Sequence, residues 1–160
     1  MTTNTLAYTL ATFCHNHDYT HNYCFCYESA GHMWAAFIPG LTVDEMVTLG
    51  HMDHSKRGAV LRYKGRAGAT IKLCIRRGIK PMDLGDAKAY KAACKDFKAA
   101  TKLNAGDYFE YVIANLYNVA WNGHNSDDAR VAGDLVIDGV AWQLKANGGN
   151  YADEGQLLRW

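Results

Sequence analysis

The polar residues best suited to chemistry lie on two short predicted strands, 131–137 and 140–146. Asp134 stands on the first strand, and Gln143 and Lys145 stand two residues apart on the second, so both side chains point to one face. The dipeptide Asp138-Gly139 between the strands is a strong signal for a tight hairpin, which brings Asp134 near the pair. A carboxylate, an amide oxygen and a lysine at one edge are suited to metal-assisted phosphodiester hydrolysis.

Each of these residue types has a role in such a reaction. A carboxylate holds a hard divalent cation, Mg²⁺ or Mn²⁺, through oxygen. The cation polarises the phosphate and lowers the pKa of a bound water. A lysine orients that water or neutralises the charge that develops on the phosphoryl oxygens. The alternative is an ordinary hairpin in which Asp134 caps a turn and Lys145 is solvated.

The string GDLVIDGVAWQLK (133–145) resembles the signature of the PD-(D/E)XK nuclease superfamily, an Asp followed on the next strand by Asp or Glu, any residue and Lys. Gln143 takes the place of the acid, which is similar to the Q-x-K triplet of the Mrr-like restriction branch. The segment 105–123 resembles the upstream helix of that branch, with Phe109-Glu110 in the position of its Phe-Glu pair. The end of the chain, Gln156-Leu157-Leu158-Arg159-Trp160, is similar to a motif of the RecB-like members.

This resemblance implies an α/β fold with a restriction-endonuclease-like core, in which a helix packs on a mixed sheet with a β-hairpin. The activity that it implies is Mg²⁺-dependent endonucleolytic cleavage of DNA, with Gln156 holding the lysine or a phosphate. The implied catalytic residues are Asp134, Gln143, Lys145 and Glu110. The implied metal ligands are Asp134, Glu110, the side-chain oxygen of Gln143 and the backbone carbonyl of Leu144.

Charge is strongly segregated along the chain, although the net charge is only +1. Residues 56–102 hold fourteen of the seventeen Lys and Arg residues and only three acids, whereas the segments on either side are both acidic. Such a field attracts polyanions, and DNA, duplex or branched, is the expected partner. The alternative is a solvated helical face. The predicted nucleic-acid ligands are Lys56, Arg57, Arg62, Lys64, Arg66, Arg76 and Arg77.

A second cluster of metal-ligating residue types lies near the N-terminus, at Cys14, His15, His17, Asp18, His21, Cys24 and Cys26. Zinc takes four such ligands in tetrahedral geometry, for example Cys14, His17, Cys24 and Cys26. The spacing, however, matches no closed zinc finger, because the cluster has no Cys-x-x-Cys pair. Polar turn residues with small buried thiols are the preferred interpretation, and a zinc-stabilised interaction module stays open as an alternative.

The remaining pattern predicts the elements that position these residues. Alternating residues predict strands in the first 40 residues. The pair Thr42 and Glu45 predicts a short capped helix at 43–49. The segment 51–66 is expected to be mostly loop, with a weak strand at 59–63. Helices are predicted over 69–77 and 86–102, the latter with its lysines outward, and a further helix follows a cap at Asn104 or Asp107. The tail 151–160 is expected to start a last helix.

Composition limits the class of protein. With 49% hydrophobic and 21% charged residues and only two prolines, the chain is neither a disordered tail nor a proline-rich linker. An odd count of five cysteines fits reduced thiols, and a cytoplasmic protein of a bacterium or an infecting phage, without membrane contact, is expected. We expect an N-terminal β-containing and basic helical region over 1–102, with DNA docking at 56–102, and a nuclease-like core over 103–160. A homodimer is compatible with this organisation, as is a non-catalytic nucleic-acid-binding or anti-defence protein on the same scaffold.

Overall fold

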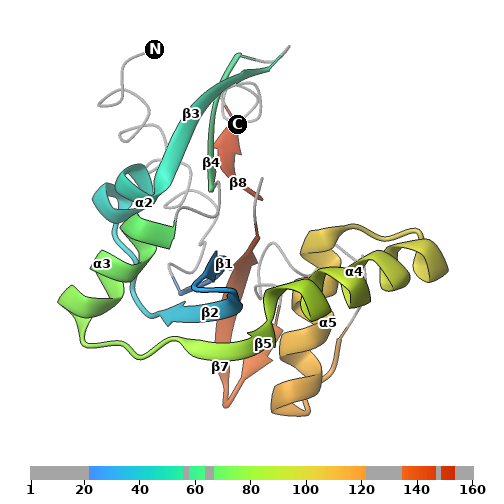
Figure 1. The fold of residues 1–160 in the computed structure, drawn as a ribbon. Helices are drawn as coiled ribbons and strands as arrows, with labels where there is room; N and C mark the ends of the chain where they lie inside the picture. Colours follow the sequence, from blue (N-terminus) through green and yellow to red (C-terminus); the bar gives the residue numbers. More distant parts are fainter. Residues whose placement is uncertain (1–21, 56–57, 64–66, 122–134, 147–148, 154–160) are drawn as a thin grey trace.

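The computed structural model describes residues 22–55, 58–63, 67–121, 135–146 and 149–153, and in them the chain has an α/β architecture (Figure 1). The larger of two sheets has five strands in the order β5-β2-β1-β7-β6. Their bounds are Tyr23–Ser29 for β1, His32–Ile38 for β2, Met82–Asp86 for β5, Leu135–Ile137 for β6 and Val140–Lys145 for β7. Strand β1 pairs antiparallel with β2 and parallel with β7, so the sheet is mixed.

The five-stranded sheet takes strands from both sides of residue 102. Strands β5, β2 and β1 precede this position, whereas β7 and β6 follow it. The division into an accessory region over 1–102 and a core over 103–160 therefore runs between strands that share one sheet. The N-terminal half supplies the strands that the hairpin needs as neighbours.

A second sheet has the order β3-β4-β8, with bounds Gly50–Ser55, Gly58–Tyr63 and Gly149–Asp153. The expected weak strand at 59–63 is confirmed. The expectation of loop is wrong for 51–55, which pairs with that strand as an antiparallel hairpin. The expected last helix is wrong for 151–153, because β8 pairs antiparallel with β4. This pairing joins residues about 90 positions apart, which a local pattern does not reveal.

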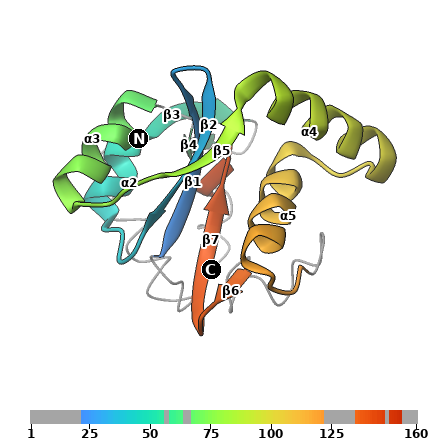
Figure 2. The same cartoon turned by 60° about the horizontal axis from the view of Figure 1, so that its bottom comes forward.

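Four helices in the described ranges flank the larger sheet: α2 (Val43–Leu49), α3 (Ala67–Arg77), α4 (Ala87–Thr101) and α5 (Ala105–Tyr117). Figure 2 shows α2 and α3 on one side of the sheet and α4 and α5 on the other. Alternate residues of β1 point to opposite faces of the sheet and belong to two separate hydrophobic cores. Tyr23, Phe25 and Tyr27 pack toward α3, whereas Cys24 and Cys26 pack with residues of α5 such as Phe109.

Local capping explains why the helices begin where the sequence predicted. Thr42 and Glu45 exchange backbone-to-side-chain hydrogen bonds at the start of α2, and Asn104 and Asp107 do the same at α5. Asp86 accepts from the backbone N–H of Ala89 at α4. At the end of α5, Leu116 and Tyr117 are exposed.

Arg77 at the end of α3 fastens that helix to α2 and to the turn after β2. Its guanidinium donates to both carboxylate oxygens of Glu45, at 2.7 and 3.0 Å, and to the backbone carbonyls of Pro39 and Gly40, each at 3.0 Å. The Glu45 side chain is only 10% exposed. The hydrogen bond from Arg77 lowers the pKa of Glu45 to about 2.

Because of this ion pair, the free energy of unfolding depends on pH in the acidic range. Because the pKa of Glu45 is lower in the folded state, its stabilisation is complete above the unfolded pKa near 4.5 and disappears as the pH falls toward 2. We expect Glu45→Gln to lose about 2 kcal/mol of unfolding free energy at pH 7 and only a small fraction of that at pH 2. Urea unfolding across this pH range measures the difference. The control is Asp44→Asn, an exposed change on the same helix. Its difference in unfolding free energy from the wild type should not shrink in this way as the pH falls.

The turn between β6 and β7 needs the residues that occupy it. Asp138 and Gly139 both have positive φ angles, 51° and 78°, as the hairpin signal predicted. A Cβ on Gly139 would meet no atom within 4 Å, so only backbone strain opposes a side chain there. Gly139→Ala should lower the unfolding free energy by about 1–2 kcal/mol. The control, Gly68→Ala in α3, should be neutral or stabilising in the same urea titration, since its Cβ also meets nothing and its φ is not positive.

Candidate functional site

Gln143 and Lys145 lie on one face of β7, as their spacing predicted. In the parallel pairing with β1, Gln143 stands beside Tyr23 and Lys145 beside Phe25. Both side chains therefore belong to the face that α2 and α3 cover. Gln143 is 5% exposed, and its backbone N–H donates to the carbonyl of Asn22 at 2.8 Å. Lys145 is half-buried.

Glu110 lies on the helix that covers the other face. Helix α5 packs through Phe109 and Ile113 against a core that includes Leu144 of β7. The five-stranded sheet therefore separates the helix of Glu110 from the side chains of Gln143 and Lys145. The predicted pair on β7 thus shares one face of the sheet, and the helix that carries Glu110 packs on the opposite face. Spacing alone could not show this, because it does not tell which face a helix covers.

The other predicted members of this site, Asp134 and Gln156, lie outside the described residues. Described pairing in the hairpin begins with Leu135 and Trp142, one position past Asp134. Among the described residues no three His, Cys, Asp or Glu side chains are grouped closely enough to hold a metal ion.

The predicted zinc cluster is divided in the same way. Cys14, His15, His17, Asp18 and His21 lie outside the described residues, whereas Cys24 and Cys26 are buried free thiols of β1. Burial raises the pKa of the Cys24 thiol and raises that of Cys26 to about 12. Both side chains belong to the hydrophobic core that packs against α5.

The predicted phosphate ligands are placed only in part. Lys56, Arg57, Lys64 and Arg66 lie outside the described residues, and Arg62 lies on β4 opposite His51. Arg77 serves the fold, since four hydrogen bonds hold its guanidinium. Arg76 is 68% exposed and makes one 3.3 Å contact with Glu45, so it is open to an anion.

A line of lysines on α4 is the main basic feature that the list of predicted ligands omitted. We call it the α4 lysine stripe, and it consists of Lys88, Lys91, Lys95, Lys98 and the C-cap residue Lys102. Their spacing of three and four residues places them on one side of the helix, over a length of about 20 Å. All five are exposed, which confirms the predicted outward orientation. The spacing is visible in the sequence, but lysines on a solvated helix show the same signal.

Aromatic packing fixes the stripe on the body of the protein. Phe97 of α4 contacts the rings of Tyr108, Tyr111 and Trp121, with ring centroids 5.2 to 5.9 Å apart. Tyr90 stacks edge-on against Tyr108 at 5.1 Å. Figure 1 shows the consequence, a helix that extends away from the sheet beside α5. The lysines are thus presented on a supported helix.

No family model, curated protein or solved structure matches the chain. Its own side chains are therefore the basis for a functional proposal. No helix in the described ranges combines the length and the apolar character that crossing a bilayer requires.

Proposed function

We propose that the protein binds nucleic acid, and that the α4 lysine stripe is the surface that contacts the phosphates. The observation that carries this proposal is the alignment of five exposed lysines along one side of a single supported helix. A nucleic acid strand is a polyanion with regularly spaced charges, and its affinity for proteins comes largely from such contacts.

The surroundings of the stripe favour an extended anion over a small one. Asp96 is the one acidic residue of α4, and it lies outside the stripe. Lys91 is neutralised in part by an ion pair with Glu28 of β1. The structure gives Lys88, Lys95, Lys98 and Lys102 no carboxylate partner in its described residues. These four cations lie too far apart along the helix to converge on one small anion.

The salt dependence of binding tests this function. For a B-form duplex each neutralised phosphate adds about −0.9 to the slope of log affinity against log salt, so four lysines predict a slope of about −3 to −4. Fluorescence anisotropy with a labelled duplex and with the corresponding single strand measures it between 50 and 300 mM salt. Binding that is absent at the lowest salt, or that does not change with salt, would contradict the proposal.

Metal-dependent phosphodiester hydrolysis is a second candidate. The observation that favours it is the shared face of Gln143 and Lys145 directly after the Asp138-Gly139 turn, an arrangement that the PD-(D/E)XK resemblance requires. In this candidate Lys145 neutralises charge that develops on the scissile phosphate, and Asp134 is the required carboxylate. Supercoiled plasmid incubated with the protein and Mg²⁺ or Mn²⁺ provides the first assay.

A further inference from the structure

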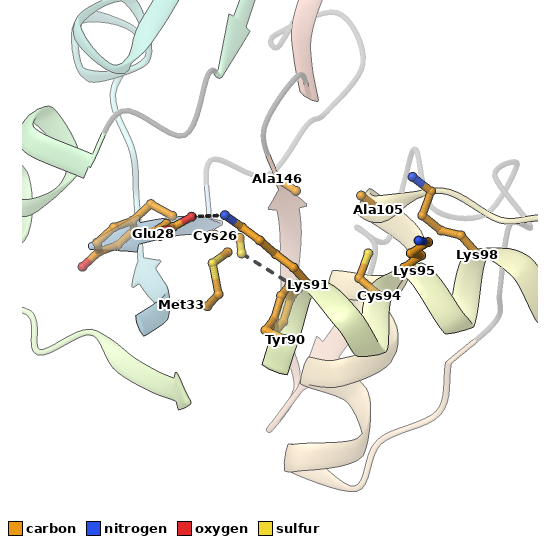
Figure 3. A pocket seen from close by; sticks show the side chains of 11 residues that line it. Cys26, Glu28, Met33, Tyr90, Lys91, Cys94, Lys95, Lys98, Ala105 and Ala146 are labelled. Atoms are coloured by element: carbon orange, nitrogen blue, oxygen red, sulfur yellow. Dashed lines mark hydrogen bonds and ion pairs between the residues drawn. The ribbon is translucent and has the colours of Figure 1, made fainter. Parts of the chain in front are cut away.

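A cavity of about 460 Å³ opens beside the α4 lysine stripe (Figure 3). Its walls come from α4, from the end of β1, from the start of β2 and α5, and from Ala146, the residue after β7. Strands β1 and β7 run parallel. The cavity lies at their carboxyl ends, because Glu28 near the end of β1 and Ala146 after β7 line it. Ligand sites in open α/β sheets are commonly found at this edge.

The interior of the cavity is apolar, with one aromatic wall. Cys26 and Met33 are buried, and Ala146 lies beside them. The hydroxyl of Tyr90 is 4.0 Å from the sulfur of Cys26, which places the tyrosine ring at the inner end. Because burial raises the pKa of Cys26 to about 12, its thiol is uncharged at neutral pH. A flat, uncharged group is the ligand that such an interior suits.

The rim is cationic. Lys91, Lys95 and Lys98 belong both to the α4 lysine stripe and to the lining of the cavity. In Figure 3 the Lys91 ammonium reaches the carboxylate of Glu28, whereas Lys95 and Lys98 lie further along the helix. The rim therefore keeps a net positive charge directly beside the apolar interior.

We propose that this cavity accepts one unstacked base of a bound nucleic acid strand, while Lys95 and Lys98 hold its neighbouring phosphates. The inference rests on the proposed nucleic-acid binding and makes it specific for single-stranded or locally opened substrate. A base has the flat shape and the uncharged faces that fit the interior. The phosphates on either side of that base lie close enough to reach the lysines of the rim. Stacking of bases on aromatic side chains is a general means of binding single strands.

Two variants that fill the cavity test the proposal. Cys94 lies on its α4 wall and Ala105 at its α5 rim, and neither is a lysine of the stripe. Cys94→Trp and Ala105→Trp should each weaken binding of a single-stranded oligonucleotide about tenfold and leave the salt slope unchanged. Ala93→Trp, on an exposed part of α4 outside the cavity, is the matched control. Thermal unfolding identifies a variant that does not fold, and Ala105 is exposed enough to accept the larger side chain.

A second measurement reports on the base itself. An oligonucleotide with one 2-aminopurine should become more fluorescent on binding to the wild type and to Ala93→Trp. The increase in fluorescence should be smaller with Cys94→Trp and Ala105→Trp, whose cavity is filled. If both filled variants bind and fluoresce like the control while the salt slope stays steep, the cavity proposal is wrong and nucleic-acid binding stands. If no salt-dependent binding is seen at all, the proposed function itself fails. Adenosine monophosphate that competes as tightly as the oligonucleotide would instead assign the cavity to a free nucleotide and overturn the proposal.

Discussion

Lys95→Glu/Lys98→Glu should bind duplex or single-stranded DNA at least about 30-fold more weakly than the wild type at 100 mM salt. Each change removes a phosphate contact and adds a repulsive charge, and the salt slope should become shallower by about 2. Both side chains are exposed, so the change should not unfold α4. Anisotropy titrations at four salt concentrations measure affinity and slope together.

The matched control is Lys72→Glu/Lys80→Glu, which changes the net charge equally at two exposed lysines outside the stripe. A general electrostatic attraction would weaken both double variants by the same factor. The α4 lysine stripe predicts that the control stays within about threefold of the wild type, since only long-range attraction changes. An equal loss in both would show that the whole basic segment, and not this helix, attracts the nucleic acid.

If the protein cleaves DNA, Lys145→Met should lower the rate of Mg²⁺-dependent cleavage by about a thousandfold or more and leave binding within about twofold. The reason is that the Lys145 side chain belongs to the sheet face that α2 and α3 cover, whereas α4 with its lysine stripe packs on the other face. Asp134→Ala should have the same effect. Nicking of supercoiled plasmid, followed with time, measures the rate, and a gel shift measures binding on the same preparation.

Gln143→Glu distinguishes a catalytic arrangement from an ordinary hairpin. In a PD-(D/E)XK-type site this change restores the common acid, so cleavage should be retained or need less Mg²⁺. In an ordinary hairpin it only adds a carboxylate at a position that is 5% exposed, which should destabilise the fold without any effect on a metal requirement. Lys80→Met is the control for loss of a lysine. A wild type that binds DNA but cleaves nothing with Mg²⁺ or Mn²⁺ would leave a non-catalytic binder.

Local signals account for the part of the fold that the sequence predicted. Thr42 with Glu45, Asn104 with Asp107, and Asp138-Gly139 each specify a helix start or a turn within four residues, so their effect does not depend on distant segments. Strand β8 shows the opposite case. Its five residues resemble a polar tail until β4, far away in the sequence, supplies the backbone partners.

The candidate site was predictable to the same extent. Alternation along β7 was enough to place Gln143 and Lys145 on one face, because that property belongs to a single strand. The side of the sheet on which α5 carries Glu110 depends on how the two cores pack, and no local pattern encodes it. The four hydrogen bonds that hold Arg77 likewise involve residues more than thirty positions earlier.

The place of β7 inside the sheet, between β1 and β6, has a consequence for synthesis of the chain. Strand β1 is made early, but its second edge is covered only by β7, and β4 likewise waits for β8. During translation two strand edges are thus open until more than 140 residues have been made, and open edges invite pairing with other chains. Contacts between such distant segments also slow folding. A nascent chain without residues 135–153 should therefore aggregate or bind chaperones. Stable structure should be gained when these residues leave the ribosome.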